Sequence, residues 1–474
     1  MGYVTDTTYA DTFFRELSPA WLNYVAAFNG FRPRSLDARF RYLELGCGFG
    51  TSSVINAAAF PHASFDACDF NAAHVAAGRA FAHELGLQNI EFHAASFEEL
   101  LHADFTPYDF VVMHGVFSWV DAATRAVLRQ LVGRLLCADG LAYVSYNALP
   151  GWSAELPLRK LLVELAATEA GTAAETSERA AATIDALSRA GLRYFSVSPA
   201  VKAAVDAYTR GKGHYLAHEF MNAAWEPFYA VDVADELGAI GLRLVGSATL
   251  TNNHLPLMLD VASTEAIATL PSLRQQQLAI DFAVNQRFRR DVFVRADHSV
   301  TPRPDALEQA VIGCMTDVEE IGLSIRVPRG EIRFHEPFIR DVRALFARGS
   351  WTFGEAVEQL AQRGQDREGI ARNLSFLVAG GALAPFARRG ASVTATPTRL
   401  ANGIVEHAIS AASSHPHRRV IPSAVAGNGV ELDAETIAML AGSSVGWPDL
   451  VKQAGPDSSM SRRLTTLARL GILE

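Results

Sequence analysis

Apolar positions in the first 150 residues fall into short runs that alternate with amphipathic segments. The runs lie at residues 42–45, 64–71, 89–97, 108–120 and 140–147. Between them, apolar residues recur at helical spacing, as in 51–60 and in 72–87, where Gly86 is the expected C-cap. Strands that alternate with helices predict a parallel, doubly wound α/β sheet, and such sheets bind ligands at the carboxyl ends of their strands.

The first strand runs directly into a turn with three alternating glycines. Gly46, Gly48 and Gly50 follow Glu44 in the pattern E-x-G-x-G-x-G. A dinucleotide-binding turn reads G-x-G-x-x-G, and Thr51 stands where its third glycine would be. Glycine allows a sharp turn and a close approach of the backbone to a ligand. The turn therefore indicates a nucleotide site other than that of NAD, with a plain strand–helix connection as the alternative.

Polar or aromatic residues at the ends of the next strands complete an adenosine site. Asp69 ends the second strand, where a carboxylate can accept both ribose hydroxyls. Ser96 and Phe97 end the third strand, where they would border an adenine ring, and His114 lies near the end of the fourth. Together these features resemble the class I S-adenosylmethionine-dependent methyltransferases. The resemblance implies S-adenosylmethionine as methyl donor, bound by Glu44, Gly46, Cys47, Gly48, Gly50, Asp69, Phe70, Asn71, Ser96, Phe97 and His114.

Three longer motifs point to one subgroup of these methyltransferases. They are H-G-V-F-S-W-V at 114–120, Y-V-S-Y-N-A-L-P-G-W at 143–152 and Y-L-A-H-E-F-M-N-A-A-W-E-P-F-Y at 215–229. They are similar to methyltransferases that carry a methyltransferase regulatory domain, a group that includes bacterial protein-lysine methyltransferases acting on outer-membrane protein. The resemblance implies a methyltransferase with a helical insertion and a protein or peptide substrate.

A sheet of this class usually has seven strands, of which five precede residue 150. Residues 231–242 have the spacing of a helix, and apolar runs follow at 242–250 and 255–262. We therefore expect a donor-binding core at 1–150, a helical insertion at 151–228, and the last helix and two strands at 229–265. The insertion would form a cap over the acceptor pocket, a dimer-forming hairpin, or both. A middle region at 266–340 and a C-terminal domain at 341–474 would follow.

Several residues near the insertion are candidates for the acceptor site. A lysine amine has a pKa of about 10.4 and must lose a proton before it attacks the methyl group. The candidates for catalysis are His114, Tyr146, His218 and Glu219, and those for substrate contact are Trp119, Asn147, Trp152 and Trp225. A structural role is the alternative for each polar candidate. His214 and His218 have the spacing of a metal pair on a helix, but methyl transfer requires no metal and we predict none.

The C-terminal third contains an internal repeat. Residues 372–383 match 462–473 at a constant offset of 90, and an aromatic turn and helix precede each copy. This pattern is typical of a winged helix, here doubled. Winged helices often bind DNA, but residues 350–474 contain 12 Lys and Arg against 11 Asp and Glu. Protein docking is therefore the expected role, and we expect truncation near residue 335 to leave donor binding intact.

Composition further restricts the expected binding partners and the expected location of the protein. The net charge is −9 and the pI about 5.9, which disfavours general nucleic-acid binding. The four cysteines include no C-x-x-C pair, and neither a signal peptide nor a membrane span is visible, so we expect a cytoplasmic protein. The alternatives to a protein methyltransferase are a small-molecule N- or O-methyltransferase and a non-catalytic donor-binding regulatory protein.

Overall fold

Seven strands form one mixed sheet, whose order is β3-β2-β1-β4-β5-β7-β6. The computed structural model describes residues 12–167, 170–211, 216, 220–296, 305–361, 366–390, 403–414, 419–442 and 458–473. The strands are β1 (Arg41–Leu45), β2 (Ser64–Asp69), β3 (Ile90–Ala94), β4 (Tyr108–Met113), β5 (Leu136–Asn147), β6 (Leu242–Ser247) and β7 (Phe288–Arg295). Strands β1 to β5 are parallel, and β7 is antiparallel to β5 and β6. The predicted Rossmann-like α/β sheet is confirmed.

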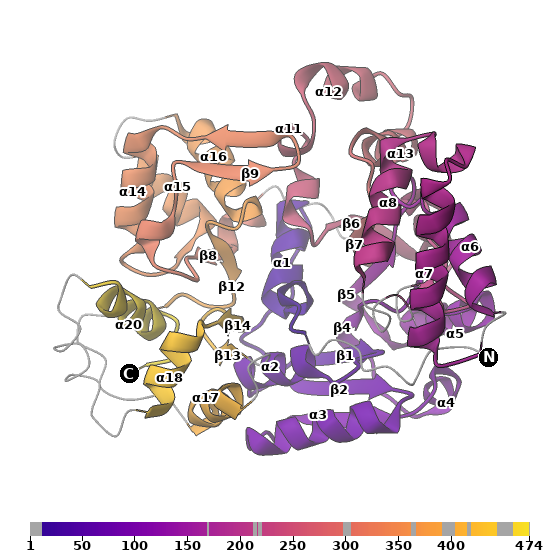
Figure 1. Cartoon of the computed structure of the whole chain (residues 1–474). Coiled ribbons are helices and arrows are strands. Elements are labelled where there is room, and N and C mark those ends of the chain that lie inside the picture. Colours follow the sequence, from indigo (N-terminus) through magenta and orange to yellow (C-terminus); the bar gives the residue numbers. More distant parts are fainter. Residues whose placement is uncertain are drawn as a thin grey trace.

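Helices cover both faces of this sheet, because side chains along each buried strand alternate between two apolar faces. The helices next to the sheet are α1 (Pro19–Phe28), α2 (Thr51–Ala59), α3 (Ala72–Glu84), α4 (Phe97–His102), α5 (Ala122–Leu135) and α10 (Ala230–Gly238). Tyr42 and Tyr143 face α1 and α2, while Leu43 and Val144 face α5 and α10. The carboxyl ends of β1, β2 and β4 consequently meet at one edge (Figure 1).

The last strand of the sheet lies later in the chain than predicted. Residues 255–262 were expected to form it, but α11 (Leu255–Met258) lies there and α12 (Val261–Ala268) begins there. Pro256 at the start of α11 has no N–H to donate, and a strand paired on both sides needs that donor. The helix α13 (Leu273–Ala283) follows, and the sheet is completed only by β7, so the predicted core boundary at residue 265 is wrong.

The predicted insertion forms a helical bundle with its own core. Its helices are α6 (Leu156–Ala167), α7 (Ala173–Arg189) and α8 (Pro199–Arg210), and they stand beside the carboxyl end of β5 (Figure 1). Leu158, Ile184 and Val205, one from each helix, pack in this core together with Trp152 and Trp225. A cap or a dimerisation element remains a prediction for this bundle.

The chain beyond the sheet forms two further units. The first C-terminal unit, residues 305–390, contains β8 (Val311–Gly313), β9 (Ser324–Val327), β10 (Gly330–Arg333), α14 (Glu336–Phe346), β11 (Trp351–Thr352), α15 (Phe353–Ala361), α16 (Arg367–Ala379) and β12 (Ala384–Phe386). The predicted boundary at 340 is wrong, because it falls inside α14 and because β8 pairs with both β11 and β12. The second C-terminal unit, residues 403–473, contains α17 (Gly403–Ser414), β13 (Val420–Ser423), β14 (Asn428–Glu431), α18 (Ala434–Gly442) and α20 (Ser459–Arg469).

The repeat occupies equivalent places in these two units. The two copies begin inside α16 and α20 and run past the ends of these helices. The aligned glycines Gly381 and Gly471 have φ values of 80° and 67°, as expected just past a helix end. The aligned leucines are all buried: Leu374, Leu377 and Leu383 in one copy, Leu464, Leu467 and Leu473 in the other. The aromatic turn predicted before the second copy lies outside the described residues, and the winged-helix interpretation stays a prediction.

The second C-terminal unit packs directly on the sheet's helices. Ile409 and Val430 share one apolar cluster with Val54 of α2 and with Val75 and Phe81 of α3. Figure 1 shows α17 next to α2 and α3. The C-terminal third therefore shares its core with the methyltransferase-like sheet.

Candidate functional site

The glycine turn between β1 and α2 has the conformation that its sequence predicts. Gly46, Gly48 and Gly50 have φ values of 73°, 54° and 70°, a backbone region that residues other than glycine rarely adopt. A Cβ at Gly50 would lie 2.4 Å from the ring of Phe92, so that glycine is needed for packing. A Cβ at Gly48 would meet no atom within 4 Å, so Gly48 instead faces open space.

That open space is a cavity at the carboxyl edge of the sheet. Its walls come from the N-terminal segment, the glycine turn, the end of β2 and the end of β4. The lining residues are Thr12, Phe14, Glu44, Gly46, Cys47, Gly48, Phe49, Gly50, Thr51, Ser52, Asp69, Phe70, His74, His114 and Gly115. The predicted donor-binding residues Glu44, Gly46, Cys47, Gly48, Gly50, Asp69, Phe70 and His114 thus line one cavity.

Asp69 is positioned by backbone donors and keeps capacity for a ligand. Its Oδ2 accepts the N–H of Gly48 at 2.9 Å, and its Oδ1 accepts that of Asn71 at 2.9 Å. Each carboxylate oxygen can accept a further hydrogen bond, which suits a vicinal diol. The Nδ1 of His74 lies 3.6 Å from Oδ1, is buried and has no hydrogen-bond partner among the described residues. Phe70 follows this carboxylate in the chain, lines the same cavity and is 53% exposed.

Glu44 is the second carboxylate of the cavity, and its environment differs. It is buried, and the hydroxyl of Ser53 donates to its Oε2. Burial raises the pKa of Glu44 to about 7, and the negative charge of Asp69 adds to this increase, while the Ser53 hydrogen bond opposes it. A cationic ligand in the cavity would favour the ionised form of Glu44.

The remaining predicted donor contacts have structural roles. Ser96 caps α4, where its Oγ accepts the N–H of Glu99 and the Glu99 side chain accepts the N–H of Ser96. Phe97 packs beside Gly46 and does not line the cavity. Asn71 caps α3 in the same way, with its Oδ1 accepting the N–H of Ala73. Donor contacts of Ser96, Phe97 and Asn71 stay predictions.

His114 lies where the cavity meets the end of β4. Its Nδ1 is 2.8 Å from the hydroxyl of Tyr143, and its ring lies 3.9 Å from that of Phe14. The ring of Phe288 is 5.9 Å away. Burial lowers the pKa of His114 to about 3, and the positive charge of Arg290 adds to this effect. His114 is therefore a neutral imidazole at pH 7.

The structure separates the other acceptor candidates from this cavity. Tyr146 points to the opposite face of the sheet, because it is an odd number of residues from Tyr143, and its hydroxyl donates to Asp291 at 2.5 Å. Trp119, Trp152 and Trp225 are buried in the core of the insertion and do not line this cavity, so their substrate contact stays a prediction.

Three further candidates, Asn147, His218 and Glu219, are not settled by these contacts. Asn147 ends β5 on the same face as Tyr143, opposite Phe288, so it remains a substrate-contact prediction. His218 and Glu219 lie outside the described residues, as does His214.

Seven cavity residues are not among the predicted site residues. Thr12 and Phe14 precede the sheet and belong to no motif, whereas the others lie in or close to recognised motifs: Phe49, Thr51, Ser52, His74 and Gly115. The helical spacing of α3 places His74 one turn after Asn71, so a sequence signal for it existed. Nothing in the sequence places Phe14 against His114.

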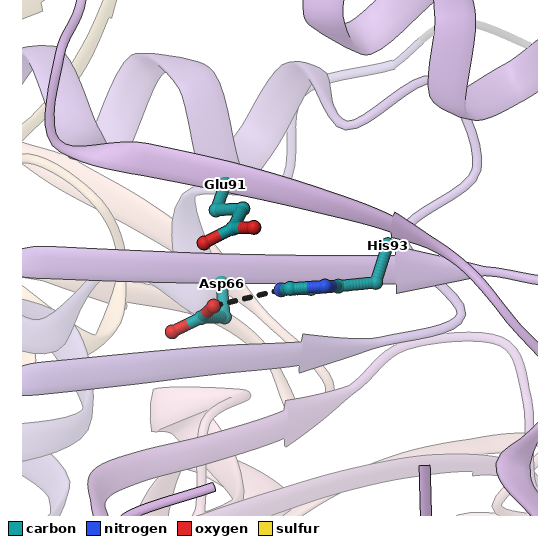
Figure 2. A group of neighbouring side chains, drawn as sticks. All are labelled: Asp66, Glu91 and His93. Atoms are coloured by element: carbon teal, nitrogen blue, oxygen red, sulfur yellow. Dashed lines mark hydrogen bonds and ion pairs between the residues drawn. The ribbon is translucent and has the colours of Figure 1, made fainter. Parts of the chain in front are cut away.

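One cluster of potential metal ligands lies elsewhere in the described part of the chain. Asp66 on β2 and Glu91 and His93 on β3 have ligand atoms within 4.8 Å of one another (Figure 2). His93 already bonds Asp66 at 2.8 Å, and the guanidinium of Arg41 lies 3.3 Å from the other Asp66 oxygen. Because Arg41 supplies positive charge where a metal ion would, these residues fit an ion-pair network better than a metal site.

Comparisons with known proteins agree with this geometry. Residues 43–142 match a methyltransferase domain family, and residues 212–295 match the predicted methyltransferase regulatory domain family. The uncharacterized protein sll1526 of Synechocystis is 30% identical over 365 residues, which cover 77% of this chain and 72% of that protein. The chain belongs to the class I S-adenosylmethionine-dependent methyltransferases with a regulatory domain. It is therefore an enzyme, and the predicted donor class is confirmed.

Rickettsia proteins provide the next comparisons. The uncharacterized protein RP789 of Rickettsia prowazekii is 25% identical over 283 residues, which cover 59% of this methyltransferase and 50% of RP789. The structure of PKMT2 from Rickettsia typhi has a TM-score of 0.71 at 16% identity and covers 98% of this chain and 99% of its own. PKMT2 in complex with AdoHcy gives a TM-score of 0.70 and covers 94% of this chain. These structures establish a shared fold.

A search for membrane-crossing segments returned a negative result. None of the described helices combines the length and apolar character that such a segment needs.

Proposed function

We propose that this methyltransferase modifies lysine side chains of a protein substrate. The observation that carries the proposal is the extent of the likeness to PKMT2, which includes the helical insertion and both C-terminal units. The motifs at 114–120, 143–152 and 215–229, which resemble those of protein-lysine methyltransferases, support it.

The cavity fits the proposed donor. S-adenosylmethionine supplies a methyl group on a sulfonium, which a nucleophile can take by in-line displacement. Asp69 would accept the ribose hydroxyls, and ionised Glu44 would attract the ammonium group of the donor. The open side of Gly48 allows the backbone to approach the ligand closely.

His114 and Tyr143 are the acceptor-side groups that this geometry favours. A protonated imidazole here would repel both a sulfonium and a lysine ammonium, and burial prevents that protonation. A base with a pKa of about 3 is a poor acceptor for an ammonium proton, so we assign His114 an orienting role. The His218 and Glu219 hypothesis for the proton acceptor stays a prediction.

The experiment is a transfer assay with methyl-labelled donor and a lysate of host cells. Label should appear in protein and, after digestion, on the side-chain nitrogen of lysine by mass spectrometry. Asp69→Asn should reduce the labelling, which ties it to this cavity. Label confined to the small-molecule fraction would contradict the proposal and favour a small-molecule acceptor.

A further inference from the structure

The N-terminal segment, residues 12–18, forms a wall of the donor cavity. Thr12 and Phe14 line the cavity, and the Phe14 ring covers His114 at 3.9 Å. The N–H of Phe14 donates to the hydroxyl of Ser52 at 3.0 Å, at the start of α2. The position of this segment therefore sets how closely one side of the cavity surrounds a ligand.

The β13–β14 hairpin of the second C-terminal unit packs against this segment and hydrogen-bonds to it. The side-chain amide of Asn428 donates to the carbonyl of Arg15 at 3.2 Å, and the hydroxyl of Ser18 donates to the carbonyl of Gly427. A Cβ at Gly429 would lie 2.7 Å from the Phe13 ring, so that ring packs on the hairpin backbone. These contacts join residues more than 400 positions apart in the sequence.

Asn428 is suited to hold the segment in place. Its side chain is 3% exposed, and its Oδ1 accepts the N–H of Gly429 at 2.9 Å. The oxygen is thus engaged within the hairpin while the amide nitrogen points to Arg15. The nearby carbonyl of Leu17 is held separately, by the hydroxyl of Tyr42 at 3.1 Å.

We propose that the β13–β14 hairpin positions the N-terminal segment against the donor cavity through Asn428, and thereby raises the affinity for the methyl donor. Asn428 is a positioning residue, because it contacts the segment and not the cavity. The inference concerns donor binding alone and is independent of which acceptor the enzyme methylates.

The test measures binding of S-adenosylhomocysteine to the full chain by calorimetry. Asn428→Asp removes the N–H donor and places a carboxylate against the Arg15 carbonyl. The Kd should rise about tenfold, the effect expected for the loss of one buried hydrogen-bonded contact. The KM for the donor should rise in parallel, while kcat at saturating donor stays within about twofold of the wild-type value.

Asp433→Ala is the matched control in the same unit. Asp433 caps α18, where its Oδ1 accepts the N–H of Thr436 at 2.8 Å, and it pairs with Arg463 at 2.9 Å. Its loss should lower the Tm, as Asn428→Asp should, but leave the Kd within about twofold. An equal rise in Kd for both variants would mean that any destabilisation of this unit weakens binding, and would overturn the proposal.

A double-mutant cycle with Phe14→Ala tests the route. Phe14→Ala alone should raise the Kd, because it removes part of the cavity wall. Adding Asn428→Asp to Phe14→Ala should then change the Kd by less than about twofold, because the two residues act through one segment. A full tenfold effect in the Phe14→Ala background, or no effect of Asn428→Asp on its own, would overturn the proposal.

Discussion

Glu44 and Asp69 are carboxylates of one cavity with different surroundings. Asp69 receives two backbone N–H groups, whereas Glu44 is desolvated, and burial raises its pKa to about 7. The folded state therefore retains the Glu44 proton at pH values where the unfolded chain has lost it, above about 4.3. Stability from this group is present at low pH and declines as the pH rises from about 4.3 to 7. Donor binding should show the opposite trend.

We predict that affinity for S-adenosylhomocysteine increases from pH 6 to pH 8. The ligand carries an ammonium group, which favours ionised Glu44, and a pKa of about 7 leaves roughly a tenth of this residue ionised at pH 6. The Kd should fall by up to about tenfold over this range. Glu44→Gln should remove the pH dependence, as measured by calorimetry at each pH.

His74→Asn is the control for that measurement. His74 lies 3.6 Å from Asp69 in the same cavity. If His74 causes the pH dependence, His74→Asn will remove it and Glu44→Gln will not. That result would contradict the assignment to Glu44.

Asp69 is expected to dominate donor affinity. Asp69→Asn keeps the size of the side chain but removes the charge that strengthens two ligand hydrogen bonds. The loss should be about 2 kcal/mol, or roughly thirtyfold in Kd for S-adenosylhomocysteine. Asp66→Asn is the matched control on the same strand, because Asp66 lies outside the cavity and pairs with Arg41 and His93. Equal losses in both variants would contradict a direct role for Asp69.

At the scale of elements, two glycines of the turn have different roles: Gly48 leaves space for a ligand, and Gly50 is needed for packing. Gly48→Ala places a methyl group into open cavity at a φ of 54°, so it should block the ligand and cost only about 1 to 2 kcal/mol of stability. Gly50→Ala places its methyl group 2.4 Å from the ring of Phe92, so it should lower the Tm much more than Gly48→Ala does. Calorimetry of binding and of unfolding checks both. Retained donor binding in Gly48→Ala would contradict the assignment of that open space to the ligand.

The elements that the sequence predicted correctly are those with a continuous apolar signal. Strands β1 to β5 have buried runs, and the turn glycines have a conformational requirement that sequence reveals. Strand β7 lacked such a signal because Arg289 and Asp291 are charged. The structure buries both, pairs them at 2.8 Å and joins Arg289 to Asp281 at 2.6 Å. A buried network of ion pairs has the hydropathy of an exposed segment, so the apolar pattern instead predicts the last strand at 255–262.

The candidate site was predictable only where its residues lie close to strand ends. Glu44, Asp69 and His114 follow from the strand pattern, because the carboxyl ends of parallel strands meet at one edge. The tryptophans of the motifs lie in a helical core, which uses aromatic residues as readily as a pocket does, so their substrate contact stays a prediction. Phe14 could not be predicted, because its place depends on contacts with distant parts of the chain.

At the scale of the whole molecule, the C-terminal third is continuous with the donor-binding sheet. The second C-terminal unit shares an apolar cluster with α2 and α3, and its hairpin contacts the N-terminal segment. We therefore no longer expect truncation near residue 335 to leave donor binding intact. We expect it to impair donor binding. Removal of this unit would expose the apolar faces of two helices that border the cavity.

The last prediction follows from the reciprocity of coupled sites. If the β13–β14 hairpin favours donor binding, the bound donor must stabilise the hairpin by the same free energy. Saturating S-adenosylhomocysteine should therefore slow amide hydrogen exchange in Val420–Glu431 by several-fold. The β9–β10 hairpin, Ser324–Arg333, is the internal control, because it packs in the first C-terminal unit and against α11.

Exchange measured by mass spectrometry on the full chain distinguishes the outcomes. Slower exchange in β13–β14 with unchanged exchange in β9–β10 is the expected result, and Asn428→Asp should abolish the difference. Equal slowing in both hairpins would indicate general stabilisation of the fold by the ligand. Unchanged exchange in β13–β14 would mean that the hairpin and the cavity are uncoupled, so the contacts of Asn428 and Ser18 would then serve folding alone.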